Sequence, residues 1–190
     1  TFGGAICTPK DTSKQVSISK DSFTLNNAEN GGAIYIGFSG TTTDTIGYCN
    51  FTNNTANESG GAIYILGNNI NVGNCIFDGN NNKGNWEYGP TFTVGENSKL
   101  IITDTVFKNN SAEGYGGAIY TTGNYNCVEI TDSQFIGNST AASGGAICSS
   151  KKTTYNVDYG LKVKNVAFTG NTSDKSGGAV YLLTDVSGLF

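Results

Sequence analysis

The sequence predicts an all-β protein that folds as a right-handed parallel β-helix, a solenoid of six to seven coils with about 28 residues and three short strands in each coil. Three observations predict it. A Gly-Gly-Ala motif recurs along the chain, a Phe-x-x-Asn motif recurs beside it, and a short alternation of aliphatic and polar residues precedes each Phe. A repeat of this length is typical of structural units stacked in a line.

The first strand of each coil is the Gly-Gly-Ala motif. Its six copies begin 28, 29, 56, 28 and 33 residues apart, and a degenerate copy, Gly89–Thr93, divides the interval of 56. The paired glycines suit a tight corner, where the backbone can need a positive φ. The apolar residue two positions after the second glycine should point into the core in every coil: Ile6, Ile34, Ile63, Phe92, Ile119, Ile147 and Val180.

The second strand of each coil is the aliphatic alternation. The positions seven and five residues before each Phe are Val16 and Ile18, Asp44 and Ile46, Ile70 and Val72, Leu100 and Ile102, Val128 and Ile130, and Leu161 and Val163. All but Asp44 are aliphatic, and strict alternation of this kind indicates a strand with one buried face. No stretch shows apolar residues at helical spacing over ten positions, so helices are not expected.

The third strand of each coil surrounds the Phe. The Phe residues are expected to point inward and to stack, and the Asn residues to form a buried amide ladder: Phe23 and Asn26, Phe51 and Asn54, Phe77 and Asn80, Phe107 and Asn110, Phe135 and Asn138, and Phe168 and Asn171. Equivalent strands of successive coils should pair in parallel, about 4.8 Å apart, and the crossover rule predicts the right hand.

Composition excludes several functions. The chain has 190 residues and a formal net charge of −4, and its basic residues are all Lys. An acidic chain without Arg is a poor ligand for nucleic acid, and no apolar run is long enough for a membrane-spanning helix. The whole of 1–190 is expected to be one domain. No polar cap precedes the first motif or follows the last, so we expect a segment of a longer solenoid or a subunit that stacks end to end.

The cysteines and the glycosylation sequons give three expectations. Cys49 and Cys75 both lie two residues before a repeat Phe in adjacent coils, so they are predicted either to form a disulfide or to remain two small buried thiols. Asn53 and Asn109 each precede a ladder Asn in an Asn-x-Ser/Thr sequon and should face outward, which makes them the candidate glycosylation sites. No Cys/His spacing typical of zinc is present, so no cofactor is expected.

Carboxylates are the remaining candidates for catalysis, because the chain has neither Arg nor His. Asp104 and Asp132 each lie three residues before a repeat Phe, so they should stack about one strand spacing apart, as an acid pair or a weak cation site. The alternative is a turn position, because Asn74 and Asn165 occupy the same place in other coils. We therefore predict that the protein is not an enzyme.

Two aromatic features are the candidate binding surfaces. A column of Tyr residues, Tyr35, Tyr64, Tyr120 and Tyr181, follows the buried apolar residue of the first strand and should face outward by alternation. Its alternative role is to stabilise the sheet by stacking. The degenerate coil carries Trp86 and Tyr88 in a predicted surface loop, where they either hold a sugar face or fold against the coil.

The combination of Gly-Gly-Ala-Ile/Val with Phe-x-x-Asn resembles the repeat of the chlamydial polymorphic membrane proteins, and it is similar to adhesin-like surface proteins of methanogenic archaea. The resemblance covers Gly3 to about Leu183. It implies an extracellular β-helix used in adhesion, and it carries no catalytic residues.

Three functions follow as hypotheses. The first is a non-enzymatic extracellular adhesion or stalk module whose partner is a glycan or protein on a host or neighbouring cell. The second is a structural filament subunit joined end to end through its strand edges. The third is a carbohydrate-active enzyme using Asp104 and Asp132.

Overall fold

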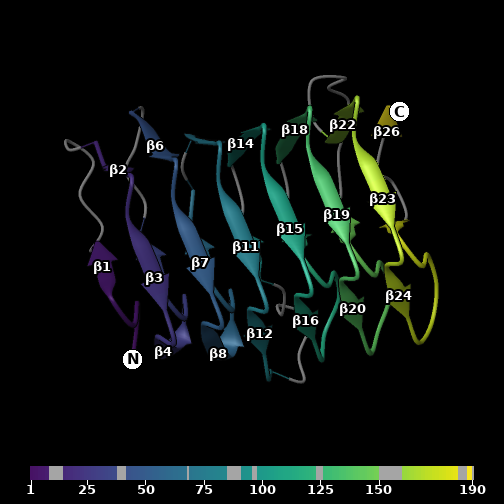
Figure 1. The fold of residues 1–190 in the computed structure, drawn as a ribbon, viewed down its shortest axis with the longest axis horizontal. Helices are drawn as coiled ribbons and strands as arrows, with labels where there is room; N and C mark the ends of the chain where they lie inside the picture. Colours follow the sequence, from purple (N-terminus) through teal and green to yellow (C-terminus); the bar gives the residue numbers. More distant parts are fainter. Residues whose placement is uncertain are drawn as a thin grey trace.

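The computed structural model describes residues 1–8, 15–37, 42–67, 69–84, 91–95, 98–122, 126–149, 160–183 and 188–189. None of these residues is helical, and none therefore forms a helix long and apolar enough to cross a membrane. The strands of this described part pair only in parallel and make four sheets that run along the solenoid, with the two ends of the chain at its opposite ends (Figure 1). The protein is thus an all-β parallel solenoid with a repeat of about 28 residues.

The Gly-Gly-Ala motifs form a seven-stranded sheet, here called the GGA sheet. Its strands are β1 (Ile6–Thr8), β5 (Ile34–Ile36), β9 (Ile63–Ile65), β13 (Phe92–Val94), β17 (Ile119–Thr121), β21 (Ile147–Ser149) and β25 (Val180–Leu182). Phe92 pairs with Ile63 on one side and with Ile119 on the other, so the degenerate motif supplies a full strand in the predicted register. An apolar side chain at this position was therefore sufficient to keep the coil in the stack.

The aliphatic alternations form a second seven-stranded sheet, here called the aliphatic sheet. Its strands are β2 (Ser17–Ser19), β6 (Thr43–Gly47), β10 (Asn69–Gly73), β14 (Lys99–Thr103), β18 (Cys127–Thr131), β22 (Gly160–Lys164) and β26 (Gly188–Leu189). Asp44, the polar exception, is buried in register with Ile70, and its Oδ1 accepts a hydrogen bond from the backbone N–H of Val16 at 2.8 Å. That bond satisfies a backbone donor at the start of the sheet.

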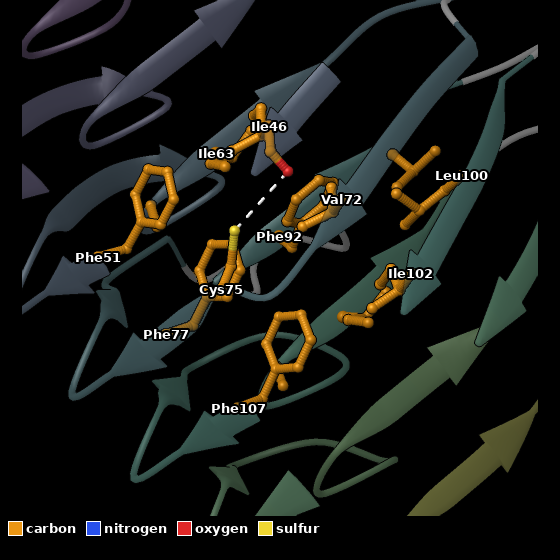
Figure 2. Packing of buried hydrophobic residues seen from close by; sticks show 14 of the residues in the cluster. Ile46, Phe51, Ile63, Val72, Cys75, Phe77, Phe92, Leu100, Ile102 and Phe107 are labelled. Atoms are coloured by element: carbon orange, nitrogen blue, oxygen red, sulfur yellow. Dashed lines mark hydrogen bonds between the residues drawn. The ribbon is translucent and has the colours of Figure 1, made fainter. Parts of the chain in front are cut away.

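The Phe motifs form a six-stranded sheet, here called the Phe sheet. Its strands are β3 (Ser22–Thr24), β7 (Asn50–Thr52), β11 (Ile76–Asp78), β15 (Val106–Lys108), β19 (Gln134–Ile136) and β23 (Ala167–Thr169), which lie side by side in chain order (Figure 1). Neighbouring Phe rings stack almost parallel, with centroids 4.6–5.2 Å apart. Figure 2 shows Phe51, Phe77 and Phe107 in this stack, with Phe92 meeting Phe77 edge-on at 5.9 Å.

A fourth sheet corrects the prediction of three strands in each coil. It lies between the Phe strand and the Gly-Gly corner and consists of β4 (Asn27–Asn30), β8 (Thr55–Ser59), β12 (Asn81–Asn82), β16 (Ser111–Ala112), β20 (Ser139–Thr140) and β24 (Thr172–Ser173). The chain bends at the ladder Asn and stays extended for two to five residues before the glycines. These strands are mostly polar and too short to show an alternation, which is why the sequence pattern did not reveal them.

The Asn ladder is present as predicted. In each link, the backbone N–H and the side-chain Nδ2–H of one Asn both donate to Oδ1 of the next, at 2.9–3.1 Å. The second Nδ2 hydrogen donates to a Phe carbonyl of the preceding coil; Asn80, for example, donates to Phe51 O at 2.9 Å. The interior amides of the ladder are thus fully hydrogen-bonded although they are completely buried.

The two positions of each Gly-Gly corner require glycine for two different reasons. The first glycine has a positive φ, +72° at Gly116. The second has no room for a side chain: a Cβ on Gly117 would lie 2.1 Å from the carbonyl oxygen of Gly145 in the next coil. Both requirements recur at each complete corner except the last, where the Cβ of Gly178 would have space.

Candidate functional site

The Tyr column lies in the GGA sheet in the predicted register but is not a uniform outward row. Tyr35 and Tyr64 are half-buried and stack on each other with centroids 5.5 Å apart. Tyr181 is also half-buried, whereas Tyr120 is only 3 % exposed and lies against Tyr115 at 6.0 Å. The predicted exposure of Tyr120 is therefore wrong.

The reason is that the middle of the GGA sheet is covered on both faces. All three residues of β13, β17 and β21 are buried. Alternation gives the direction of a side chain, but it does not show whether another segment lies over that face. The accessible part of the column is consequently the Tyr35–Tyr64 pair at one end and Tyr181 at the other. Burial, and next the nearby Cys7 thiol, raises the pKa of Tyr35, so this phenol stays neutral at physiological pH.

The second aromatic feature, Trp86 and Tyr88, lies outside the described residues. Its role in binding stays a prediction.

Asp104 and Asp132 occupy a turn. Both are exposed and both have a left-handed backbone, with φ of 47° and 50°. Asn74 and Asn165 have the same backbone in the same column, and Asn165 Nδ2 donates to Asp132 Oδ1 at 2.5 Å. Asp and Asn tolerate this conformation better than other side chains, which accounts for the acids without a catalytic role. Within the described part of the chain, no three His, Cys, Asp or Glu side chains gather where they could hold a metal ion.

Cys49 and Cys75 are neighbours in adjacent coils, and the structure holds both as free buried thiols. Each Sγ donates to a backbone carbonyl two residues earlier, at 3.2 Å to Gly47 O and Gly73 O. Cys75 Sγ also accepts from the backbone N–H of Cys49 at 3.4 Å. Burial raises the pKa of Cys75 to about 11, so this thiol is protonated at neutral pH.

The same column continues with hydroxyl groups. Thr105 Oγ1 donates to Thr103 O at 2.8 Å and accepts from the N–H of Cys75, and Ser133 Oγ repeats the arrangement with Thr131 O and the N–H of Thr105. The sequence analysis missed this second ladder. Its signal was present in the column Cys49, Cys75, Thr105 and Ser133, whose members are all small donors that can also accept a hydrogen bond.

The two candidate glycosylation sites face outward as expected. Asn53 and Asn109 are exposed, each at a left-handed corner with φ of 52° and 54°. Asn138, which also stands in a sequon, is fully buried in the ladder. Modification of Asn53 or Asn109 stays a prediction.

A further surface was not singled out from the sequence. A groove of about 360 Å³ lies on the outer face of the aliphatic sheet, where Gly47 and Gly73 are paired in register. Tyr48 lines it and is 62 % exposed. Tyr48 has φ of 57°, in a column where four other coils place Asn or Asp and the first coil places Lys20, and a left-handed backbone costs such a residue about 1–2 kcal/mol. In a sequence, Gly is typical of turns, so Gly47 and Gly73 gave no indication of a groove.

The comparisons with known proteins agree with the repeat. The family model described as the Chlamydia polymorphic membrane protein repeat matches residues 48–66, 104–122, 132–150 and 165–182. Each match begins at a left-handed corner and runs through the Phe strand, the short fourth strand and the GGA strand, so it leaves the aliphatic strand out. Neither the curated proteins nor the solved structures contain a match to this chain. In four of its coils, the chain is therefore similar to the repeat of the Chlamydia polymorphic membrane proteins.

Proposed function

We propose that this chain is a non-enzymatic, extracellular surface protein that acts in adhesion, with the solenoid as scaffold and its outer faces as the binding surface. The observation that supports the proposal is the set of four matches to a repeat described as that of a membrane protein family. The partner would be a glycan or protein exposed on a host or neighbouring cell.

The packing supports a scaffold role. The Phe rings stack in the core, the ladder amides use all of their hydrogen-bonding groups, and the corner glycines are required by φ or by space. The repeat motif is thus used in folding, and binding falls to side chains that the motif does not specify. Tyr35 and Tyr64 are the first candidates, since a stacked pair of half-buried rings offers a rigid amphipathic contact at little entropic cost.

The test is adhesion of beads that carry the purified chain to a monolayer of cultured epithelial cells, at a concentration where the chain sediments as one species. Beads with the chain should bind at least about tenfold more often than beads with albumin, and the double substitution Tyr35→Thr, Tyr64→Thr should remove most of that difference. Thr is chosen because Thr93 occupies the same column. The matched control is Ile76→Thr on the outer face of the Phe sheet, which should bind normally.

The possible results separate the two parts of the proposal. Equal binding of chain-coated and albumin-coated beads would contradict adhesion to this surface. Full binding by the double variant would leave adhesion standing and remove the Tyr pair from it.

A further inference from the structure

The outer face of the aliphatic sheet is hollowed at one place. Four coils contribute to the groove there, and its floor is the column in which Gly47 and Gly73 follow one another between Ser19 and Thr103. Two successive coils without a side chain expose the backbone over about two strand spacings, close to 10 Å. A hollow of that length accommodates a six-membered ring with its substituents.

These two glycines are not required by the fold. Both lie within strands and neither has a left-handed φ, and a Cβ on Gly47 would meet only Gly73 O, at an ordinary 3.8 Å. A Cβ on Gly73 would come within 3.2 Å of the Thr103 hydroxyl, a side-chain atom that can turn away. The corner glycines differ, because a Cβ on Gly32 would lie 2.0 Å from a backbone oxygen. The open floor therefore has no structural cause of its own.

Tyr48 forms a wall of this groove. Its ring is mostly exposed, and its backbone N–H donates to Gly73 O at 3.0 Å, which anchors the corner next to the floor. Four other coils place Asn or Asp at this left-handed corner and the first places Lys20, so Tyr48 is the aromatic member of its column and a candidate for a role in binding.

The lining indicates the chemistry of the ligand. Among the residues that the structure describes, no charged one lines the groove, and the polar side chains there are hydroxyls and amides, among them Thr45, Asn71 and Asn74. Such groups both donate and accept hydrogen bonds, as sugar hydroxyls do, while a ring such as Tyr48 packs against the apolar face of a sugar. We propose that this groove binds a neutral pyranose residue of a glycan, with Tyr48 under the sugar face and Asn71 and Asn74 on its hydroxyls.

The groove lies almost entirely outside the segments that match the family repeat. The aliphatic strands that form its floor, β6 and β10, lie outside all four matches to the family repeat, and only Tyr48 falls within one. The inference rests on the proposed adhesive function and adds to it a ligand class and a site separate from the Tyr35–Tyr64 pair.

The experiment measures binding of the purified chain to four neutral oligosaccharides, the hexamers of glucose, mannose, galactose and N-acetylglucosamine, by titration calorimetry with sialyllactose as the charged comparison. At least one neutral hexamer should bind. Tyr48→Asn, which installs the residue found at Asn74 and Asn165, should weaken it about tenfold or more. Gly47→Val should abolish it by filling the floor, and thermal melting should show that both variants fold.

The Tyr35→Thr, Tyr64→Thr variant should bind the sugar with unchanged affinity. The inference is overturned if none of the four hexamers binds, if only sialyllactose binds, or if both groove variants bind as the native chain does. If beads that carry the native chain adhere while the native chain binds none of the four hexamers, the groove is rejected and the adhesive function stays intact. Sugar binding without bead adhesion would support the groove and contradict the adhesive function.

Discussion

Asn54 gives both its backbone N–H and its side-chain Nδ2–H to a single acceptor, Oδ1 of Asn80, at 3.0 and 2.9 Å. Asn80 repeats the arrangement with Asn110, so one side chain in each coil satisfies the backbone at the bend between the Phe sheet and the fourth sheet. No water reaches these amides, because both Asn54 and Asn80 are completely buried.

Asn80→Ala should be among the most destabilising single changes in the chain. It leaves the two donors of Asn54 without their acceptor and removes the Asn80 Nδ2 bonds to Asn110 Oδ1 and Phe51 O, although the backbone N–H of residue 80 still reaches Asn110 Oδ1. Buried groups that lose a partner cost about 1–3 kcal/mol each, so we expect a loss of about 4 kcal/mol or more in the free energy of unfolding, measured by urea titration. Asn50→Ala, on an exposed position of β7, is the control and should change it by less than about 0.5 kcal/mol. Equal effects would contradict the ladder's role.

Phe77→Ala should open the centre of the core. The ring stacks on Phe51 and Phe107, both at 4.6 Å, and is fully buried. A loss of about 3–5 kcal/mol is expected from the cavity. The neighbouring Ile76 points the other way and is 40 % exposed, so Ile76→Ala should cost much less in the same urea titration. A similar cost for the two would mean that β11 is turned over.

Glycine substitutions should separate the corners from the groove. Gly117→Ala brings a Cβ onto the oxygens of Gly145 and Ser139, at 2.1 and 2.6 Å, and should cost about 3 kcal/mol or prevent folding. Gly47→Ala meets no close atom and should stabilise the chain by about 0.4–1 kcal/mol through the unfolded state. Differential scanning calorimetry of the two variants checks this, and a destabilised Gly47→Ala would show that the groove floor has a structural role.

Stability should fall at alkaline pH because of buried thiols. Burial raises the pKa of Cys148 to about 12. The folded thiol therefore keeps its proton while the unfolded one, with a pKa near 8.5, loses it. The contribution is fully present below about pH 8.5 and is lost as the pH rises towards 12, at about 1.4 kcal/mol per pH unit.

The measurement is a set of urea titrations between pH 7 and pH 10.5 on the native chain and on Cys148→Ala. The free energy of unfolding of Cys148→Ala should fall less steeply with pH than that of the native chain, by about 1.4 kcal/mol per pH unit. Parallel curves would show that Cys148 ionises as easily in the folded chain as in the unfolded one.

The core could be predicted from sequence because it is periodic. Ile34, Ile63 and Phe92 share one column in the sequence and one column in the structure, including the coil whose motif had degenerated. The amide ladder followed from the same regularity, since an Asn at a fixed distance from a buried Phe in every coil needs a common partner.

The surfaces could be predicted less well because they depend on what lies over them. Tyr120 and Tyr64 occupy equivalent positions, but Tyr120 is buried and Tyr64 is half-exposed. The groove exists because two glycines, which have no side chains, lie next to each other in adjacent strands. A motif within one coil cannot show such a relationship between coils. The Cys49 and Cys75 thiols were likewise interpreted as a pair, while their column continues in Thr105 and Ser133.

The Phe stack shows that the packing of the core does not depend on how many residues lie between successive Phe residues. Twenty-eight residues separate Phe23 from Phe51 and thirty-three separate Phe135 from Phe168, yet the rings are 4.9 and 5.2 Å apart. The spacing of the Phe residues in the sequence therefore changes without shifting their column in the core. Mutations and insertions can therefore accumulate on the surface, while the core is selected separately for folding. During evolution, such a protein can change what it recognises and keep its fold.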